Sequence, residues 1–154
     1  MKKNATMHTI KKATLNDLEA VAYLFDQYRV FYQKPSDIKQ AKVFIHERLT
    51  NNDSEIFVCY DAHHVMMGFT QLYPLFSSTR MRKLWLLNDL FVAEKHRGKG
   101  VSVALIEQAK ELCIATDACG LMLETAKTNM VGNNLYPKTG FSLDNDHNYY
   151  SWDR

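Results

Sequence analysis

The stretch from Leu84 to Leu112 constrains the fold more than any other, because within it the apolar pattern changes from that of a strand to that of a helix. The segment LWLLNDLFV (84–92) is apolar enough to predict a buried strand, and the polar segment AEKHRGKG (93–100) follows it at once. After this segment, apolar residues recur at helical spacing, at Val101, Leu105, Ala109 and Leu112. A strand therefore runs through a glycine-rich turn directly into an amphipathic helix.

The rest of the chain alternates between the same two patterns. The expected elements are a strand at 8–13, a helix from 14, a helix from 36, strands at 54–60, 65–74 and 84–92, a helix from 100, a strand at 121–126, a helix at 129–139 and a strand at 148–154. The three successive strands predict an antiparallel meander. Together these elements predict an α/β (α+β) fold with a mixed, mostly antiparallel central sheet flanked by helices, in a single domain over residues 1–154.

The first two expected helices begin with capping signals. Thr14 and Asp17 have the spacing of a capping box, and apolar residues follow them at helical spacing as far as Tyr28. After a proline, Ser36 predicts the N-cap of the second helix, with Asp37 in the first helical turn. Thr14 and Asp17 thus predict a complete capping box, whereas Lys39 prevents a full capping box at the start of the second helix.

Composition and charge exclude several classes of protein. With 154 residues, of which 46% are hydrophobic and 23% charged, the chain can bury one globular core. Its 19 basic and 17 acidic residues give a net charge of +2, which is too balanced to predict nucleic acid as a partner. No segment has the apolar length of a signal peptide or a membrane span, so we expect a cytoplasmic protein with no membrane partner.

The cysteines and histidines predict neither disulfides nor a metal site. The three cysteines form no CxxC pair, and an odd number argues against a disulfide framework. We expect them to be small buried hydrophobic residues. The six histidines are scattered along the chain, so we expect no metal ion.

The turn between the strand and the helix has the composition of an anion-binding site. Gly98 and Gly100 can adopt positive φ angles, which would turn backbone N–H groups toward one point at a helix N-terminus. Lys95, Arg97 and Lys99 add full positive charges. The motifs GxxxxGK[ST] and GxGxxG with its acidic partner are absent, which disfavours nucleoside triphosphates and nicotinamide cofactors. Taken alone, the turn is equally compatible with a solvated loop that binds nothing.

Two blocks in the second half of the chain resemble the GNAT-type N-acetyltransferase superfamily. They are LNDLFVAEKHRGKGVSVALIEQA (87–109) and TNMVGNNLYPKTGF (128–141), and they match in order and separation. The family's glycine-loop pattern is filled here by Arg97, Gly100 and Ser102, where serine departs from the usual glycine or alanine. The first expected strand and helix resemble the family as well, so the similarity spans nearly the whole chain.

This resemblance implies acetyl-coenzyme A as the acetyl donor and assigns residues to it. The glycine loop would wrap the pyrophosphate with Arg97, Gly98, Lys99, Gly100, Val101, Ser102 and Val103. The strand before the loop would pair with the pantetheine arm through Leu90, Phe91 and Val92. Asn129 and Tyr136 match the later residues that contact the cofactor, and Tyr136 would serve the leaving thiol.

The residue that removes the proton from the acceptor is less clearly assigned. Some enzymes of the family carry an acidic pair where this chain has Asn88 and Asp89. An asparagine cannot act as a base, so Asp89 is the candidate, directly or through water. Strand alternation predicts that the two side chains point to opposite faces. A structural carboxylate that bonds nearby backbone or an arginine is an equally good interpretation of Asp89.

The acceptor is expected to be a primary amine. Tyr28 and Tyr32 border the acceptor pocket by resemblance and could hold a cationic amine against their rings, and Asn88 would join them; core packing is the alternative for Tyr28. We expect a small amine of polyamine or amino-sugar type. The alternatives are a protein lysine or N-terminal acetyltransferase and a non-catalytic acyl-coenzyme A sensor. The sequence feature that favours the sensor is Asn88 in place of an acidic residue. Tyr149 and Tyr150 would edge the pocket or a homodimer contact.

Overall fold

The computed structural model describes residues 8–154, and its helices and strands follow the order that the sequence predicts except for the last expected strand. The elements are β1 (Thr9–Lys12), α1 (Leu18–Phe31), α2 (Ile38–Asn51), β2 (Glu55–Tyr60), β3 (Met66–Ser77), β4 (Arg82–Val92), α3 (Val101–Ala115), β5 (Leu121–Met122) and α4 (Met130–Lys138). The chain divides into two compact units, one that ends at Leu123 and one of residues Glu124–Arg154. The expectation of a single domain stays a prediction.

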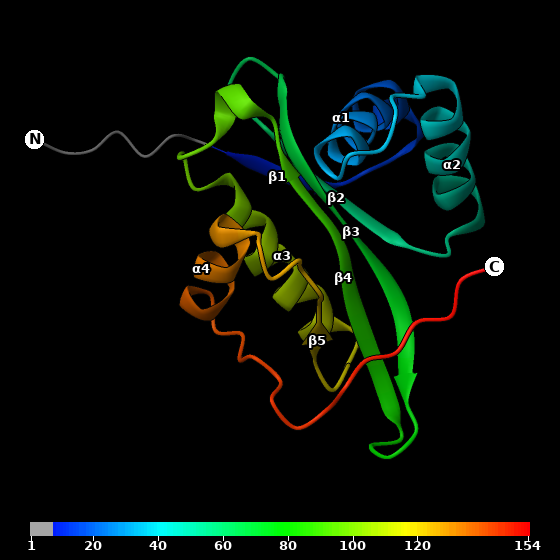
Figure 1. Cartoon of the computed structure of the whole chain (residues 1–154). Coiled ribbons are helices and arrows are strands. Elements are labelled where there is room, and N and C mark those ends of the chain that lie inside the picture. The colour runs from blue at the N-terminus through cyan, green and yellow to red at the C-terminus, as the bar shows by residue number, and fades with distance from the viewer. Residues whose placement is uncertain (1–7) are drawn as a thin grey trace, which may run out of the picture. The chain divides into compact units, whose positions relative to one another are not determined.

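The first unit is built on one five-stranded sheet in the order β1-β2-β3-β4-β5. Neighbouring strands are antiparallel except β4 and β5, which are parallel. Helices α1 and α2 lie against one face of the sheet and α3 lies against the other (Figure 1). The predicted fold class, mixed and mostly antiparallel with flanking helices, is confirmed, and so is the meander of β2, β3 and β4.

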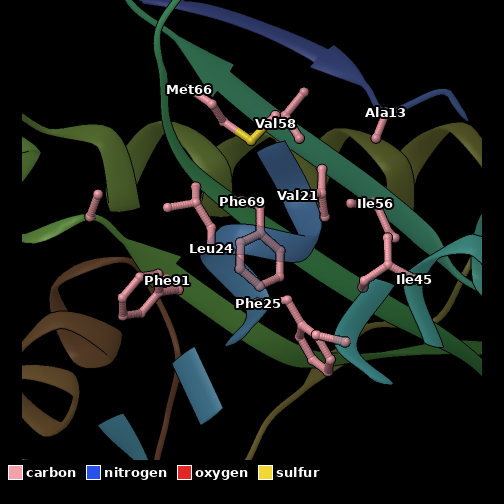
Figure 2. Packing of buried hydrophobic residues seen from close by; sticks show 12 residues of the cluster. Ala13, Val21, Leu24, Phe25, Ile45, Ile56, Val58, Met66, Phe69 and Phe91 are labelled. Atoms are coloured by element: carbon pink, nitrogen blue, oxygen red, sulfur yellow. The ribbon is translucent and has the colours of Figure 1, made fainter. Parts of the chain in front are cut away.

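The core on the α1 side is aromatic and aliphatic. The Phe25 ring of α1 lies 5.3 Å from the Phe44 ring of α2 and 6.4 Å from the Phe69 ring of β3, measured between centroids. Figure 2 shows Phe25 and Phe69 beside Leu24 and Ile45. Fully burying a side chain of this size contributes roughly 1.5–3 kcal/mol. This packing fixes α1 and α2 over the sheet, with the C-terminal end of α1 near β4.

The start of α1 is held by the predicted pair of Thr14 and Asp17. The carboxylate of Asp17 accepts a hydrogen bond from the backbone N–H of Thr14 at 2.8 Å, and a short 3-10 turn (Leu15–Asp17) leads into the helix. The same carboxylate accepts from Lys11 Nζ at 2.8 Å and from the Tyr60 hydroxyl at 2.6 Å. Asp17 therefore closes the 3-10 turn that leads into α1 and ties this turn to β1 and β2.

The start of α2 differs from the prediction by one residue. Asp37, not Ser36, is the N-cap, and its side chain accepts a hydrogen bond from the backbone N–H of Gln40. The Ser36 hydroxyl instead donates to Asp26 Oδ2 at 2.6 Å. Ser36 therefore bonds Asp26 and does not cap α2. Asp26 is buried, and a buried carboxylate without hydrogen-bond partners would be costly.

Two expected strands are shorter or missing. The strand expected at 121–126 is limited to Leu121–Met122, the only two residues of the segment paired with β4. Residues 148–154 form no strand, so that prediction is wrong. Tyr149, Tyr150 and Trp152 are exposed, which shows that aromatic content alone does not create a strand where no sheet edge accepts it.

Other expectations concern the chain as a whole. Within residues 8–154, no helix has both the length and the apolarity needed to cross a membrane. The three cysteines are free thiols, and Cys59 is buried as expected. The first residues of the chain, 1–7, lie outside the described residues. No group of metal-binding side chains occurs among the residues that are described.

We predict that replacing Asp17 by asparagine destabilises the fold in a pH-dependent way. Burial would raise the pKa of Asp17, but hydrogen bonds from Lys11, Tyr60 and the Thr14 backbone outweigh it and lower the pKa to about 2. The carboxylate thus stabilises the fold above its ordinary pKa, and this contribution is lost as the pH falls toward 2. Asp17→Asn should lower the free energy of unfolding by about 2 kcal/mol at neutral pH and much less near pH 2.

Urea titrations at several pH values measure this difference. Glu107→Gln is the matched control, because it removes an exposed ion pair with Lys110 and should cost well under about 1 kcal/mol. A loss for Asp17→Asn that is the same at pH 7 and near pH 2 would contradict the assignment.

Candidate active site

The glycine turn has the backbone geometry expected of an anion-binding loop. Gly98 has a φ of 72° and Gly100 a φ of 81°, both in the left-handed region that favours glycine. A Cβ atom added at either position would meet no atom within 4 Å, so both face open space. Helix α3 begins directly after Gly100, and its first backbone N–H groups have no partner within the helix. The turn thus presents N–H donors and the positive end of a helix dipole to an open surface.

The basic side chains of the turn have different roles. Arg97 donates from Nε to the backbone oxygen of Val92 at 3.1 Å, and its guanidinium lies 5.8 Å from the Phe91 ring centroid and 6.0 Å from that of Phe31. Arg97 therefore fastens the turn to the end of β4. Lys99 is exposed, and its backbone oxygen lies 2.7 Å from His8 Nε2. Ser102, where the glycine-loop pattern departs, is half-buried in the first turn of α3.

A buried histidine beneath this turn was not singled out by sequence reasoning. His96 is buried in the short 3-10 turn Glu94–His96, and neither ring nitrogen has a hydrogen-bond partner among the described residues. Burial lowers its pKa, and the charges of Lys99 and Lys95 lower it further. The ring is therefore held in its neutral form, and the charge of the turn comes from its lysines and arginine.

Strand β4 has an open edge just before the glycine turn. Its pairing with β5 is limited to Trp85 with Leu121 and Leu86 with Met122. Within residues 8–154, no strand pairs with residues 88–92 on the side away from β3. Those backbone groups of Leu90, Phe91 and Val92 that point away from β3 can therefore pair with an added, strand-like partner. The backbone oxygen of Val92 already accepts a hydrogen bond from Arg97.

A β-bulge at Asn88 overturns the expected alternation. Gln71 of β3 pairs with Asp89 and Leu72 pairs with Leu87, so Asn88 is an extra residue in β4. The bulge changes the orientation of the strand, and the side chains of Asn88 and Asp89 meet: Asn88 Nδ2 donates to Asp89 Oδ1 at 3.1 Å. The prediction that these two side chains lie on opposite faces is wrong, because alternation holds only where the ladder is regular.

Asp89 is almost completely buried, with 3% of its surface exposed, and lies at the end of a polar chain. Ser54 Oγ donates to Gln71 Oε1 at 2.9 Å, which directs the amide nitrogen of Gln71 toward Asp89. Gln71 Nε2 then donates to Asp89 Oδ2 at 2.6 Å. Burial raises the pKa of Asp89, while hydrogen bonds from the Gln71, Tyr28 and Asn88 side chains act in the opposite direction. The carboxyl group is thus oriented from several sides and has a higher affinity for a proton than an exposed aspartate.

The predicted acceptor residues surround a pocket of about 280 Å³ beside Asp89. The pocket is lined by Phe25, Tyr28, Arg29, Tyr32, Lys34, Phe44, Tyr73, Asn88 and Asp89. The Tyr28 hydroxyl donates to the Asn88 backbone oxygen at 3.3 Å, and its ring lies 5.0 Å from that of Tyr32. Burial and the nearby charge of Asp89 raise the pKa of Tyr73 to about 12. Tyr28, Tyr32, Asn88 and Asp89 are therefore brought together, as the sequence predicts.

Asn129 and Tyr136 lie in the second unit and are described there. Asn129 is the N-cap of α4: its Oδ1 accepts from the Gly132 backbone N–H at 3.1 Å, and its Nδ2 donates to Thr125 Oγ1 at 2.9 Å. Tyr136 lies on the same helix, and its ring packs edge-on against Phe141 at 5.8 Å between centroids. The predicted short helix is confirmed, and it ends before Gly140, which has a φ of 90°.

Sequence reasoning missed the polar residues that support Asp89. Gln71 and Ser54 are both buried, and neither belongs to a recognisable motif. A glutamine inside the apolar run MMGFTQLY was the available signal, because a buried amide requires partners for both its oxygen and its nitrogen. The identity of those partners depends on strand register, which the sequence alone does not give.

Comparisons with known proteins found similar sequences and similar structures. A sequence model described as the acetyltransferase (GNAT) family matches residues 19–141. An uncharacterized N-acetyltransferase of Bacillus subtilis, YhfO, is 38% identical over 141 residues, which cover 92% of this chain and 94% of that protein. The crystal structure of a probable acetyltransferase has a TM-score of 0.90 and 33% identity, covering 95% of this chain and 97% of the other.

A more distant solved structure is similar in fold alone. It is a predicted acetyltransferase from Clostridium acetobutylicum, described with acetyl-CoA, with a TM-score of 0.76 at 13% identity. The match covers 94% of this chain and 96% of that one.

We predict that Gln71→Leu raises the pKa of Asp89. Leucine has a similar volume but cannot donate a hydrogen bond, so the carboxylate loses a partner that favours its charged form. Ser54 also loses its acceptor, and we expect a fall in unfolding free energy of about 1–3 kcal/mol. The measurement is a ¹³C NMR titration of aspartate carboxyl groups, with the Asp89 signal assigned by Asp89→Asn.

Thr70→Val is the matched control for this titration. It removes a hydrogen bond of 2.8 Å from Thr70 Oγ1 to the backbone oxygen of Asp89, leaving the carboxylate contacts intact. In this control variant, the pKa of Asp89 should not rise. An unchanged titration in Gln71→Leu would show that Gln71 does not set the protonation of Asp89.

Proposed function

Because the chain belongs to the acetyltransferase (GNAT) family, we propose that it transfers the acetyl group of acetyl-coenzyme A directly to a primary amine of a small molecule. The observation that carries this proposal is the glycine turn at the start of α3, next to the open edge of β4 and the Asp89 pocket. These features supply, in one compact unit, an anion site, a backbone edge and a buried carboxylate.

The glycine turn fits the diphosphate of the donor. The N–H groups at the start of α3 are hydrogen-bond donors for phosphate oxygens, and the helix dipole stabilises negative charge there by roughly 0.3–1 kcal/mol. Open space at Gly98 and Gly100 would let a ligand approach the backbone closely. Lys99 adds a full positive charge at the exposed edge of the turn.

The open edge of β4 fits the amide-containing arm of the donor. Successive residues of a strand direct their N–H and C=O groups to opposite edges, so every second residue among Leu90, Phe91 and Val92 presents these groups at the open edge. An amide group can hydrogen-bond to such an edge as an added strand does. A backbone N–H in this segment would also polarise the thioester carbonyl of the bound donor. The donor would supply the activated acetyl group at that point.

Asp89 would remove the proton of the acceptor. An alkylammonium with a pKa near 10.4 must lose a proton before its nitrogen can attack, which costs roughly 4–5 kcal/mol at neutral pH. In the proposed step the ammonium proton first passes to Asp89, directly or through water, and the freed nitrogen lone pair forms a C–N bond with the acetyl carbon. The C–S bond then breaks, and the second proton that the nitrogen loses ends on the departing sulfur, which leaves as the free thiol. Burial raises the pKa of Asp89, which makes it a stronger base than an exposed aspartate.

Tyr136 is proposed to assist departure of the thiol. A phenol with a pKa near 10 does not readily give its proton to a thiolate with a pKa near 8.5, because the transfer is uphill by roughly 2 kcal/mol. A hydrogen bond that strengthens as charge builds on the sulfur avoids this cost. In this proposal Asn129 supports Tyr136 by capping the helix that carries it.

We predict that Gly100→Val abolishes stabilisation by coenzyme A. Purified wild-type protein should melt at a higher temperature with coenzyme A, because a ligand that binds the folded state stabilises it by mass action. A valine at a φ of 81° is strained, and its side chain would fill the open space that faces the ligand.

Two further variants separate strain from loss of binding. In Gly100→Asn, the asparagine tolerates a positive φ, but its side chain still fills the open space at the turn. This variant should therefore also lose the rise in melting temperature with coenzyme A. Gly120→Ala lies outside the turn and should keep it. Wild-type protein that shows no shift at millimolar coenzyme A would overturn the donor assignment, and normal shifts in both Gly100 variants would place the phosphates elsewhere.

We predict that Tyr136→Phe lowers kcat by about 10- to 1,000-fold, with little change in folding or coenzyme A affinity. The assay measures release of free thiol from acetyl-coenzyme A in the presence of primary amines, with Tyr23→Phe on the exposed side of α1 as the control. Equal turnover in Tyr136→Phe and wild-type protein would exclude Tyr136 as the donor to sulfur. Coenzyme A binding without thiol release from any amine or peptide would favour the sensor alternative.

A further inference from the structure

The acceptor pocket is lined by more cationic than anionic side chains. Among the described residues that form it, Asp89 is the only carboxylate, and Arg29 and Lys34 are both cationic. The remaining lining residues are an asparagine and five aromatic residues. Asp53, which is near enough to affect the pKa of Tyr73, is paired with Arg48 through a hydrogen bond of 2.8 Å. The pocket lining therefore combines one buried carboxylate with two cationic side chains, of which Arg29 also forms an ion pair with Asp26 behind the lining.

Lys34 is held in place by a well-bonded loop between α1 and α2. The backbone N–H of Gln33 donates to Val30 at 2.9 Å, and that of Lys34 donates to Arg29 at 3.0 Å. The far end of the loop is fastened by Asp26, which accepts from the backbone N–H of Asp37 at 2.7 Å as well as from Ser36. The backbone at Lys34 is thus ordered before any ligand arrives, so binding does not have to order the loop.

Arg29 retains hydrogen-bond donors for a ligand. Its Nη1 donates to the Pro35 backbone oxygen at 3.1 Å and lies 3.7 Å from Asp26 Oδ1. That second distance is longer than a hydrogen bond, and both Asp26 oxygens already accept from closer donors. A guanidinium carries five N–H groups, so several remain for a planar anion such as a carboxylate or a phosphate.

This distribution of charge discriminates between classes of amine. A polyamine carries at least two ammonium groups: Asp89 could receive one, and the next would meet Arg29 and Lys34. Like charges brought together in a partly desolvated site are repelled, and such juxtaposition is a common source of specificity. An acceptor with one ammonium and one anionic group would match both ends of the pocket, with its carbon chain against the aromatic rings.

We propose that the natural acceptor is an amine that also carries an anionic group, a carboxylate or a phosphate, with the amine at Asp89 and the anion at Arg29 and Lys34. This inference rests on the proposed acetyl transfer and narrows its acceptor. It differs from the amine of polyamine or amino-sugar type that the sequence predicts, because the proposed acceptor carries an anionic group as well as the amine.

The test compares amines that differ only at the end away from the reacting nitrogen. Four series of matched chain length, from two to six carbons, are assayed by thiol release from acetyl-coenzyme A: α,ω-diamines, neutral amino alcohols, ω-amino carboxylates and ω-amino phosphates. At the best chain length, an anionic amine should exceed the matched diamine in kcat/KM by about 10-fold or more, the size expected for a charged hydrogen bond. The difference should shrink as salt is added.

Lys34→Glu tests the origin of the preference. The variant should lose about 10-fold in kcat/KM for the anionic amine and gain toward the diamine, while its thermal shift with coenzyme A stays that of the wild type. Lys39→Glu is the matched control, because it makes the same change of charge at an exposed position outside the pocket lining. The control should keep the wild-type preference, and comparison of the carboxylate and phosphate series identifies the anion.

The outcomes separate this inference from the proposed function. Acetylation that is fastest with diamines or neutral amino alcohols would overturn the anionic acceptor and leave acetyl transfer intact. A preference for anionic amines that Lys34→Glu does not reduce would also overturn it. Failure of all four series and of peptide amines, with coenzyme A still bound, would overturn the proposed function itself.

Discussion

The candidate site depends on the β-bulge at Asn88. On the C-terminal side of the bulge, Asp89 pairs with Gln71; on the N-terminal side, Leu87 pairs with Leu72. One extra residue thus lets a single strand direct Asp89 toward the α1 side of the sheet while Trp85, further back, donates to Thr116 at the end of α3. Without the bulge, a regular pleat would alternate strictly, and the two neighbouring side chains could not meet. The bulge therefore creates the contact between Asn88 and Asp89 and the polar end of the pocket.

The sequence predicts the elements that have a strong local signal. The capping pair of Thr14 and Asp17, the apolar segment before the turn and the helix after Gly100 each combine several agreeing preferences, and each is confirmed. The glycine turn could be placed precisely because positive φ angles are costly for other residues. The conformation of residues 148–154 could not be predicted in this way, because their aromatic side chains would form a strand only beside a free sheet edge. Whether such an edge is available depends on the whole fold.

The polar chain behind Asp89 shows the limit of sequence reasoning more sharply. The candidate base and the tyrosines of the pocket were identified from a family resemblance, but Ser54 and Gln71 were not. Ser54 precedes β2, Gln71 lies within β3 and Asp89 lies within β4, so their contact depends on the register of adjacent strands. A slip of one residue would turn Gln71 to the opposite face of the sheet. Register is set by packing and by the bulge, and neither leaves a motif.

The structure also changes the interpretation of Asn88. From the sequence, an asparagine in place of an acidic residue was a reason to consider a protein that binds the donor without turnover. In the fold, the Asn88 amide donates to Asp89 Oδ1, whereas a carboxylate there would repel the buried charge beside it. A second acid would raise the pKa of the pair and leave one of the two groups protonated at a higher pH. With Asn88 and Gln71 as donors on opposite oxygens, one carboxylate can be both buried and ionised. Asn88 is therefore compatible with the proposed role of Asp89 as a base, and the argument for lost turnover loses its main observation.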